Sequence, residues 1–151
     1  MSSPLLYAPT FVDASAWIAL LHPRDRHHYA AQTVYRQLMH SEVVLITTNW
    51  VVYEELTLLK SRMGSQQAEQ LWEIANDPIL VSLARVTDAI EAAALRLFFE
   101  YQDKTWGVVD CTSLVVMAET GCRQAFGFDQ HFQEAGQQRG FRVVPENSVS
   151  L

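Results

Sequence analysis

The sequence has little cysteine, glycine or proline, with two, six and five of these residues among 151. Two cysteines are too few for a disulfide framework. Cys111 and Cys122 fall near the two ends of one predicted helix, roughly 16 Å apart at 1.5 Å rise per residue, and this exceeds the ~7 Å limit for a disulfide. We therefore expect two free thiols, which suit a reducing cytosol. No glycine-rich or proline-rich linker divides the chain.

Positive charge and long apolar runs are also scarce. Eleven Lys and Arg stand against 17 Asp and Glu, for a formal net charge of -6, which excludes a simple electrostatic binder of nucleic acid or anionic membrane. No stretch reaches the ~18 consecutive apolar residues of a membrane span, and the start lacks the basic region and apolar core of a secretory signal. We expect a cytoplasmic protein that does not contact a membrane.

The composition that remains is ordinary, with 49% hydrophobic and 19% charged residues. It indicates a single domain over residues 1–151 with short frayed ends. A chain of this length buries roughly 70% of its unfolded surface, so it needs no structural metal for stability.

Short apolar or β-branched runs alternate with helix-like segments along the chain. We predict strands at 7–12, 42–46, 79–83, 124–128 and 141–144. We predict helices at 15–21, 27–40, 51–63, 65–75, 87–101 and 110–120. Parallel strands need long crossovers, which are usually helices, so this order predicts an α/β fold of three layers, α/β/α, around a central and mainly parallel sheet.

Four acidic residues fall where such a sheet would gather them. Asp13 and Asp129 each end a predicted strand, Asp110 begins a predicted helix, and Glu54 lies one or two turns into the helix after the second strand. Ligands of open parallel sheets bind at the C-terminal edge of the strands. Carboxylates packed together repel one another unless a cation lies between them. All-oxygen ligands favour Mg²⁺ or Mn²⁺ over zinc, and the chemistry they imply is metal-assisted attack of water on a phosphodiester.

Two alternatives stay open from the residues alone. An Asp after a strand also caps helices, so Asp13 and Asp110 taken singly could be structural. Helical periodicity favours Glu55 over Glu54 for the inward face, because Glu55 has more apolar neighbours at helical offsets.

Four segments together resemble the acidic motifs of the PIN-domain ribonucleases, in particular the VapC-type toxins of toxin–antitoxin systems. They are FVDAS, TTNWVVYEELTLLKSR, WGVVDCTSLVVMAETG and AFGFDQHF, in this order over residues 11–132. Matched motif by motif, the family's metal-binding acids fall on Asp13, Glu54, Asp110 and Asp129. The Ser or Thr that follows the first Asp by two residues falls on Ser15, which donates to a ligand or caps the helix. Gly127 departs from the family, whose members often carry Thr or Ser there.

This resemblance implies a ribonuclease that cleaves single-stranded RNA with Mg²⁺ or Mn²⁺ as cofactor. Asp13 and Asp110 would be the principal ligands, with Glu54 and Asp129 completing the shell or orienting water. It also implies a small antitoxin partner and a homodimer, although a housekeeping role in RNA processing stays open. Candidates for phosphate contacts are Arg24, Arg26, His27, His28, Lys60 and Arg62.

Two other classes of protein were compared with this pattern. A phosphatase of the haloacid dehalogenase type also has an Asp after its first strand, but it carries a second Asp two residues later, where this chain has Ser15. A non-catalytic binding module with an acidic pocket is the other alternative, and the intact set of four acids disfavours it.

Overall fold

The structure, a computed structural model, describes residues 8–146. Within this range it contains five short strands: β1 (Thr10–Val12), β2 (Leu45–Thr48), β3 (Val81–Ala84), β4 (Gln124–Phe126) and β5 (Arg142–Val144). The helices are α1 (Ala14–Leu21), α2 (His28–His40), α3 (Asn49–Met63), α4 (Ser65–Ala75), α5 (Asp88–Glu100), α6 (Val108–Thr120) and α7 (Gln130–Arg139).

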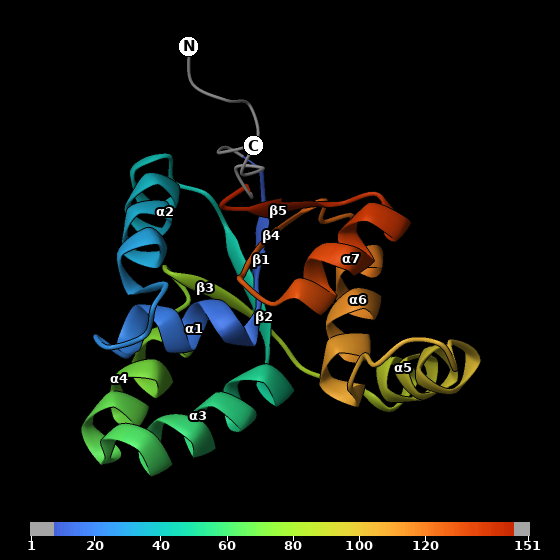
Figure 1. Ribbon diagram of the computed structural model, residues 1–151, viewed down its shortest axis with the longest axis horizontal. Coiled ribbons are helices and arrows are strands. Elements are labelled where there is room, and N and C mark those ends of the chain that lie inside the picture. Colours follow the sequence, from blue (N-terminus) through green and yellow to red (C-terminus); the bar gives the residue numbers. More distant parts are fainter. Residues whose placement is uncertain (1–7, 147–151) are drawn as a thin grey trace.

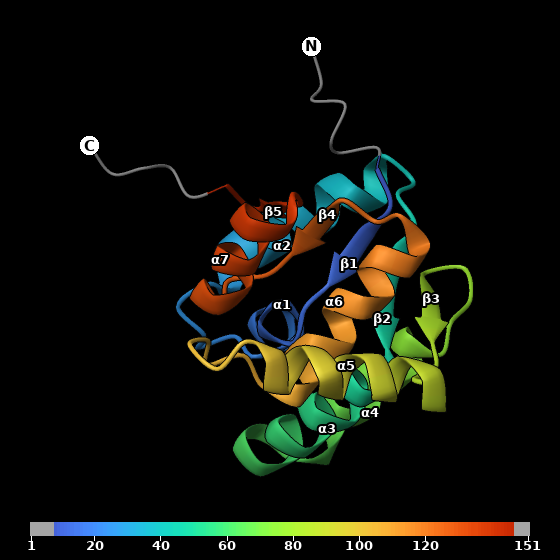
Figure 2. The same ribbon diagram turned by 90° about the vertical axis from the view of Figure 1, so that its right-hand side faces the viewer.

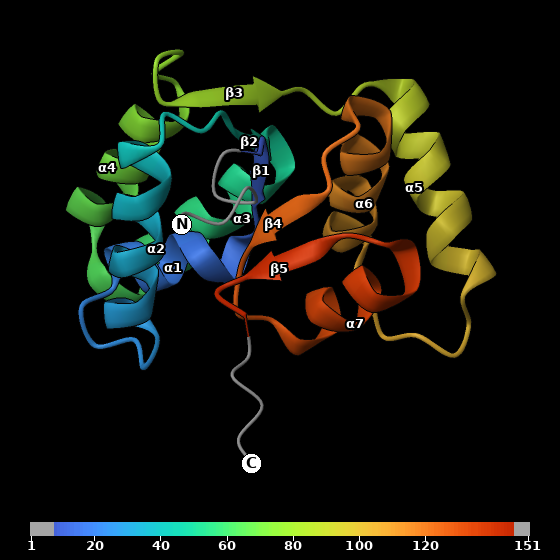
Figure 3. The same cartoon turned by 90° about the horizontal axis from the view of Figure 1, so that it is seen from above.

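The strands form one sheet in the order β3-β2-β1-β4-β5, and every neighbouring pair is parallel. Helices α1, α2 and α4 lie on one side of this sheet, and α5, α6 and α7 lie on the other (Figures 1 and 3). Figure 2 looks onto the side covered by α5, α6 and α7. The predicted three-layer α/β/α fold is therefore confirmed.

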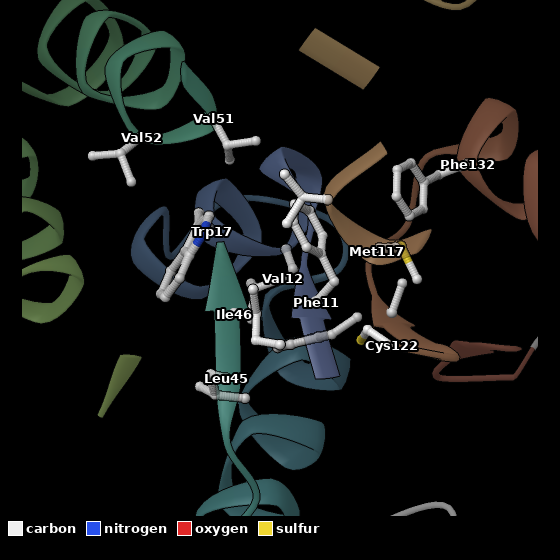
Figure 4. Close-up of a cluster of buried hydrophobic side chains, with 14 of the residues drawn as sticks. Phe11, Val12, Trp17, Leu45, Ile46, Val51, Val52, Met117, Cys122 and Phe132 are labelled. Carbon is white, nitrogen blue, oxygen red and sulfur yellow. The ribbon is translucent and has the colours of Figure 1, made fainter. Parts of the chain in front are cut away.

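The centre of the sheet is buried on both faces. All three residues of β1 are buried, and Phe11 stacks on Phe132 of α7 with ring centroids 6.3 Å apart. On the other side, Trp17 of α1 lies beside Val51 and Val52 of α3 (Figure 4). This packing fixes the position of the C-terminal end of β1, where Asp13 follows.

Three predicted strands begin too early in the sequence. At β1, Tyr7 lies outside the described residues, and Pro9 has no N–H to give to a sheet ladder. At β2, Glu42 has a left-handed φ of 55°, so the chain still turns there and the strand instead runs on through Thr48. At β3, Asp77 accepts hydrogen bonds from the Ile79, Leu80 and Val81 N–H groups, which holds 77–80 as a turn.

Helix α7 is absent from the sequence prediction, which placed only a strand on either side of it. Its sequence, QHFQEAGQQR, is strongly polar and buries only Phe132, Ala135 and Gly136. Gly136 is required by close packing, because a Cβ there would lie 2.8 Å from the Phe141 carbonyl oxygen. The other ends differ by one or two residues: α1 and α6 begin earlier than predicted, α3 begins at Asn49, and β4 ends at Phe126.

Both cysteines are free, as predicted, and both are buried. Among residues 8–146, no helix has the length and apolar character needed to cross a membrane.

Candidate active site at the C-terminal edge of the sheet

Asp13 lies at the centre of the site. It follows β1 directly, caps the N-terminus of α1, and is only 3% exposed. Burial and the charges of Asp110 and Asp129 together raise the pKa of its carboxyl to about 7, against the opposing effect of the hydrogen bond from Ser15. Asp13 is therefore a helix cap, and it is also a carboxylate whose charged form is disfavoured by burial and by neighbouring acids.

The Ser15 hydroxyl joins two loops that are far apart in the sequence. Its Oγ donates to Asp13 Oδ2 over 2.8 Å. The same oxygen accepts from the backbone N–H groups of Phe128, at 2.8 Å, and Asp129, at 3.2 Å. The loop after β1 is thereby fastened to the loop after β4, and the orientation of Asp13 is fixed by the same contact.

Asp110 approaches the site from the first turn of α6. Its Oδ2 accepts from the backbone N–H of Gly107 at 3.1 Å, which closes the start of the helix. Burial raises the pKa of the Asp110 carboxyl; the hydrogen bond from Gly107 opposes this, Asp129 adds to it, and His131 lowers it. The charges of Asp110 and Asp129 act on Asp13, and that of Asp129 acts on Asp110, so these predicted acids lie within electrostatic range of one another at the same edge of the sheet.

Asp129 is partly open to solvent, with a side chain 40% exposed. It caps α7 by accepting from the His131 backbone N–H at 2.7 Å, and the His131 ring lies 3.7 Å away. The other side of this ring contacts the Thr105 hydroxyl at 3.0 Å, in the loop before α6. His131 thus connects the segment that carries Asp129 with the loop that precedes Asp110. Nothing in the sequence around His131 indicated this role.

The two consecutive glutamates of α3 face in different directions. Glu54 is exposed, and burial followed by the charge of Asp110 raises the pKa of its carboxyl. Glu55 is 2% exposed, and burial, Glu54 and then Asp13 raise its pKa to about 8. Periodicity therefore identified the buried glutamate correctly, while the family motif points to the one beside Asp110.

Gly127, where the family often carries Thr or Ser, packs against the site. A Cβ at this position would lie 3.0 Å from Asp13 Cβ and 3.1 Å from both Asp13 Oδ2 and Ser15 Oγ. With Asp13 and Ser15 arranged as they are here, a larger residue would press on the hydrogen bond between them.

The donor set fits a hard divalent cation. Buried carboxylates that raise one another's pKa values are stabilised by a positive ion between them, and the carboxyl Oε2 of Glu55 is buried without a hydrogen-bond partner. Within residues 8–146, no three His, Cys, Asp or Glu side chains are close enough to form a ready-made metal site. The acids would therefore have to draw together around an ion.

A basic loop borders the acidic edge. His27 stacks on Phe128 with ring centroids 4.4 Å apart, and Phe128 immediately precedes Asp129. Arg24 and Arg26 are exposed in the same loop, between α1 and α2. By contrast, Lys60 and Arg62 lie in the last turn of α3.

Comparison with known proteins agrees with this architecture. The family model of the PIN domain matches residues 10–138, and the chain belongs to the PIN-domain family. It is similar to the protein named 23S rRNA-specific endonuclease VapC20 in two strains of Mycobacterium tuberculosis, at 32% identity over 126 residues, which are 83% of this chain and 93% of the relative. The crystal structure of Mycobacterium tuberculosis VapC20, described as a Sarcin-Ricin loop cleaving toxin, superposes with a TM-score of 0.76. That match has 32% identity and covers 84% of this chain and 95% of the other. The family predicted from the four motifs is confirmed.

Proposed function

We propose that this chain is a metal-dependent endoribonuclease that cleaves single-stranded RNA and serves as the toxin of a toxin–antitoxin pair. The observation that carries the proposal is the coupling of Asp13, Asp110 and Asp129 at the C-terminal edge of a PIN fold. The similarity to a protein named as an rRNA-specific endonuclease supports RNA as the substrate.

Each side chain has a distinct part in this proposal. Asp13 and Asp110 would hold Mg²⁺ or Mn²⁺, directly or through water, and Glu54 and Asp129 would complete the shell or orient the attacking water. Ser15 holds Asp13 in place through its 2.8 Å hydrogen bond. A divalent ion bound here polarises a phosphoryl oxygen and lowers the pKa of its water.

The basic loop gives the RNA a place to enter. Arg24 and Arg26 are exposed beside the acidic edge, and such side chains supply most of the sequence-independent affinity for phosphate. They compensate locally for the net charge of -6. We propose that the RNA backbone contacts this loop while the scissile phosphate lies at Asp13 and Asp110.

Family membership and composition support the remaining proposals. We propose a small antitoxin that covers the acidic edge, a homodimer, and a cytoplasmic location, the last supported by the two free thiols. The cluster of buried hydrophobic residues within residues 8–146 supports our proposal of one domain over residues 1–151.

The test is a cleavage assay on end-labelled RNA with single-stranded loops, in EDTA and with added Mg²⁺ or Mn²⁺. We expect cuts within the RNA only with metal, and loss of cleavage in Asp110→Asn and Glu54→Gln. Glu119→Gln is a matched control, because Glu119 is exposed near the far end of α6. Cleavage that survives exhaustive EDTA treatment would refute the metal requirement. Release of phosphate from small monoesters, or RNA binding without cleavage, would favour the phosphatase or the binding module.

A further inference from the structure

An aromatic stack fastens the basic loop to the acidic edge. The His27 ring lies nearly parallel to the Phe128 ring, with an interplanar angle of 9° and centroids 4.4 Å apart. Phe128 in turn contacts the Phe126 ring of β4 edge-on, with centroids 6.1 Å apart, and Phe126 is completely buried. Because Asp129 is the next residue after Phe128, this contact holds the loop between α1 and α2 beside a segment that carries an acid of the proposed site.

The loop is also braced by hydrogen bonds of its own. The Asp25 backbone N–H donates to the His22 carbonyl at 2.9 Å, and the His28 N–H donates to the Asp25 carbonyl at 3.0 Å. Asp25 Oδ1 accepts from the His27 N–H at 2.8 Å. The His28 ring contacts the Ala19 carbonyl of α1 at 2.7 Å. A loop held in this way is organised before a ligand arrives, which lowers the entropic cost of binding.

Arg26 is oriented by the stacked histidine. Its Nε–H donates to His27 Nε2 over 3.1 Å, which requires a neutral imidazole with its proton on Nδ1. Arg26 is exposed, and within residues 8–146 its terminal amino groups make no hydrogen bond or ion pair. A guanidinium whose terminal amino groups are free can bind a phosphate through two parallel hydrogen bonds.

We propose that His27 is a positioning residue for RNA binding: stacked on Phe128, it holds the Arg26 guanidinium through Nε2 so that this group binds a phosphate of the RNA near the one that is cut. The inference rests on the proposed ribonuclease function. Phosphate contacts fix the position of a nucleic acid on a protein. A guanidinium that is already oriented loses less side-chain freedom when the RNA binds, so the contact is stronger than one from a freely moving arginine.

The experiment measures the binding of a fluorescent single-stranded RNA to the full chain, in EDTA over a range of salt concentrations, together with melting temperatures. His27→Ala removes the ring, whereas His27→Phe keeps a ring to stack on Phe128 and removes Nε2. Arg26→Ala and the double variant of Arg26→Ala with His27→Ala complete the set. His40→Ala is the matched control, because His40 is an exposed histidine at the other end of α2.

We expect both His27 variants and Arg26→Ala to bind RNA about three- to tenfold more weakly, as for the loss of one charged contact near the surface. His27→Phe should still melt at the temperature of wild type. Since His27 acts through Arg26, the double variant should bind no more weakly than Arg26→Ala alone. The salt slope should fall in magnitude by about 0.7 in both of these proteins. In cleavage assays with Mg²⁺, KM should rise in the His27 variants while kcat changes little.

Three results would overturn the inference. Wild-type affinity in His27→Phe would show that Nε2 does not hold Arg26. Additive losses in the double variant would show that the two side chains act independently. A lower melting temperature in His27→Ala with unchanged affinity and KM would leave His27 a structural role alone. If wild type cleaves RNA and the His27 variants match it, only this inference falls; if wild type neither binds nor cleaves RNA, the proposed function falls as well.

Discussion

Asp13→Asn should make the metal-free protein more stable at pH 8, although it removes a residue of the active site. Asn keeps the shape of the side chain and caps a helix about as well as Asp. It removes the charge that burial, Asp110 and Asp129 make unfavourable. A purely structural capping role predicts no such gain.

The size of the effect follows from the pKa. The pKa of the Asp13 carboxyl rises from 3.8 to about 7 in the folded protein. At ~1.4 kcal/mol for each factor of ten in the ionisation constant, this corresponds to a cost on the order of 4 kcal/mol for the charged form. Below pH ~4 the group is protonated in both states. Between pH ~4 and 7 the folded protein holds a proton that the unfolded chain has released, so stability falls as pH rises, and above pH ~7 the full cost remains.

The assay is melting in EDTA from pH 5 to pH 8 for wild type and Asp13→Asn. We expect the variant to be more stable by up to about 4 kcal/mol at pH 8, and by about 1–2 kcal/mol at pH 5, where ~2–4 °C in Tm corresponds to each kcal/mol. Glu55 and the histidines are present in both proteins, so the difference between the curves isolates Asp13. Excess Mg²⁺ at 100 times its Kd should stabilise wild type by ~2.7 kcal/mol, and Asp13→Asn less.

Asp13→Ala provides the control for capping, because a lost cap costs ~1 kcal/mol whatever the pH. Two results would refute this reasoning: a difference in stability between wild type and Asp13→Asn that does not change with pH, or a variant that is less stable than wild type at pH 8. Either would show that the charged form of Asp13 does not destabilise the folded protein.

Three further predictions concern the surroundings of Asp13. Ser15→Ala should lower the free energy of unfolding by about 2–3 kcal/mol in thermal melts, because the hydroxyl makes three hydrogen bonds. Ser15→Thr keeps a hydroxyl and should retain most of the stability. Equal losses in the two variants would contradict a stabilising role for these hydrogen bonds. The double variant Arg24→Ala, Arg26→Ala should bind RNA more weakly. The slope of log K against log salt concentration should fall in magnitude by about 1.4, at ~0.7 for each phosphate contact on a single strand. An unchanged slope in a binding titration would show that this loop does not contact the RNA backbone. Gly127→Ala should remain folded by circular dichroism but cleave RNA more slowly, because the new Cβ would crowd Asp13 and Ser15. Full activity would show that these two side chains can shift without loss of function.

The sequence predicted the layers and the family because those depend on local signals. The alternation of strands and helices along the chain indicates a parallel sheet. Asp13, Asp110 and Asp129 follow strands or begin helices, so both the family motif and the preference of Asp for helix caps mark these positions. Helix α7 was missed because it is stabilised by tertiary contacts of Phe132 and Gly136 rather than by an amphipathic pattern. A weak local signal of this kind cannot reveal packing that depends on residues elsewhere in the chain.

The site itself was only partly predictable for a similar reason. Periodicity found the buried side of α3 and hence Glu55, but it carries no information on which carboxyl lies near Asp110. The bridge from Ser15 to Phe128 joins residues 113 positions apart, and no local pattern records such a contact. In the sequence, Gly127 is only a departure from the family motif, and its close packing against Asp13 and Ser15 becomes visible only in the folded structure.

The central place of β1 has a consequence for when the protein can act. Asp13 stands at the end of β1, yet β4, the strand that pairs with β1 on one side, follows only at residues 124–126. Pairing over such a distance is slow, because loop closure must precede the contacts that stabilise it. An unfinished chain that lacks β4 and the Ser15 bridge also lacks Asp129, so it cannot assemble the acidic edge. The proposed cleavage of RNA therefore requires that synthesis has passed residue 129, although the first acid of the site is already made at residue 13.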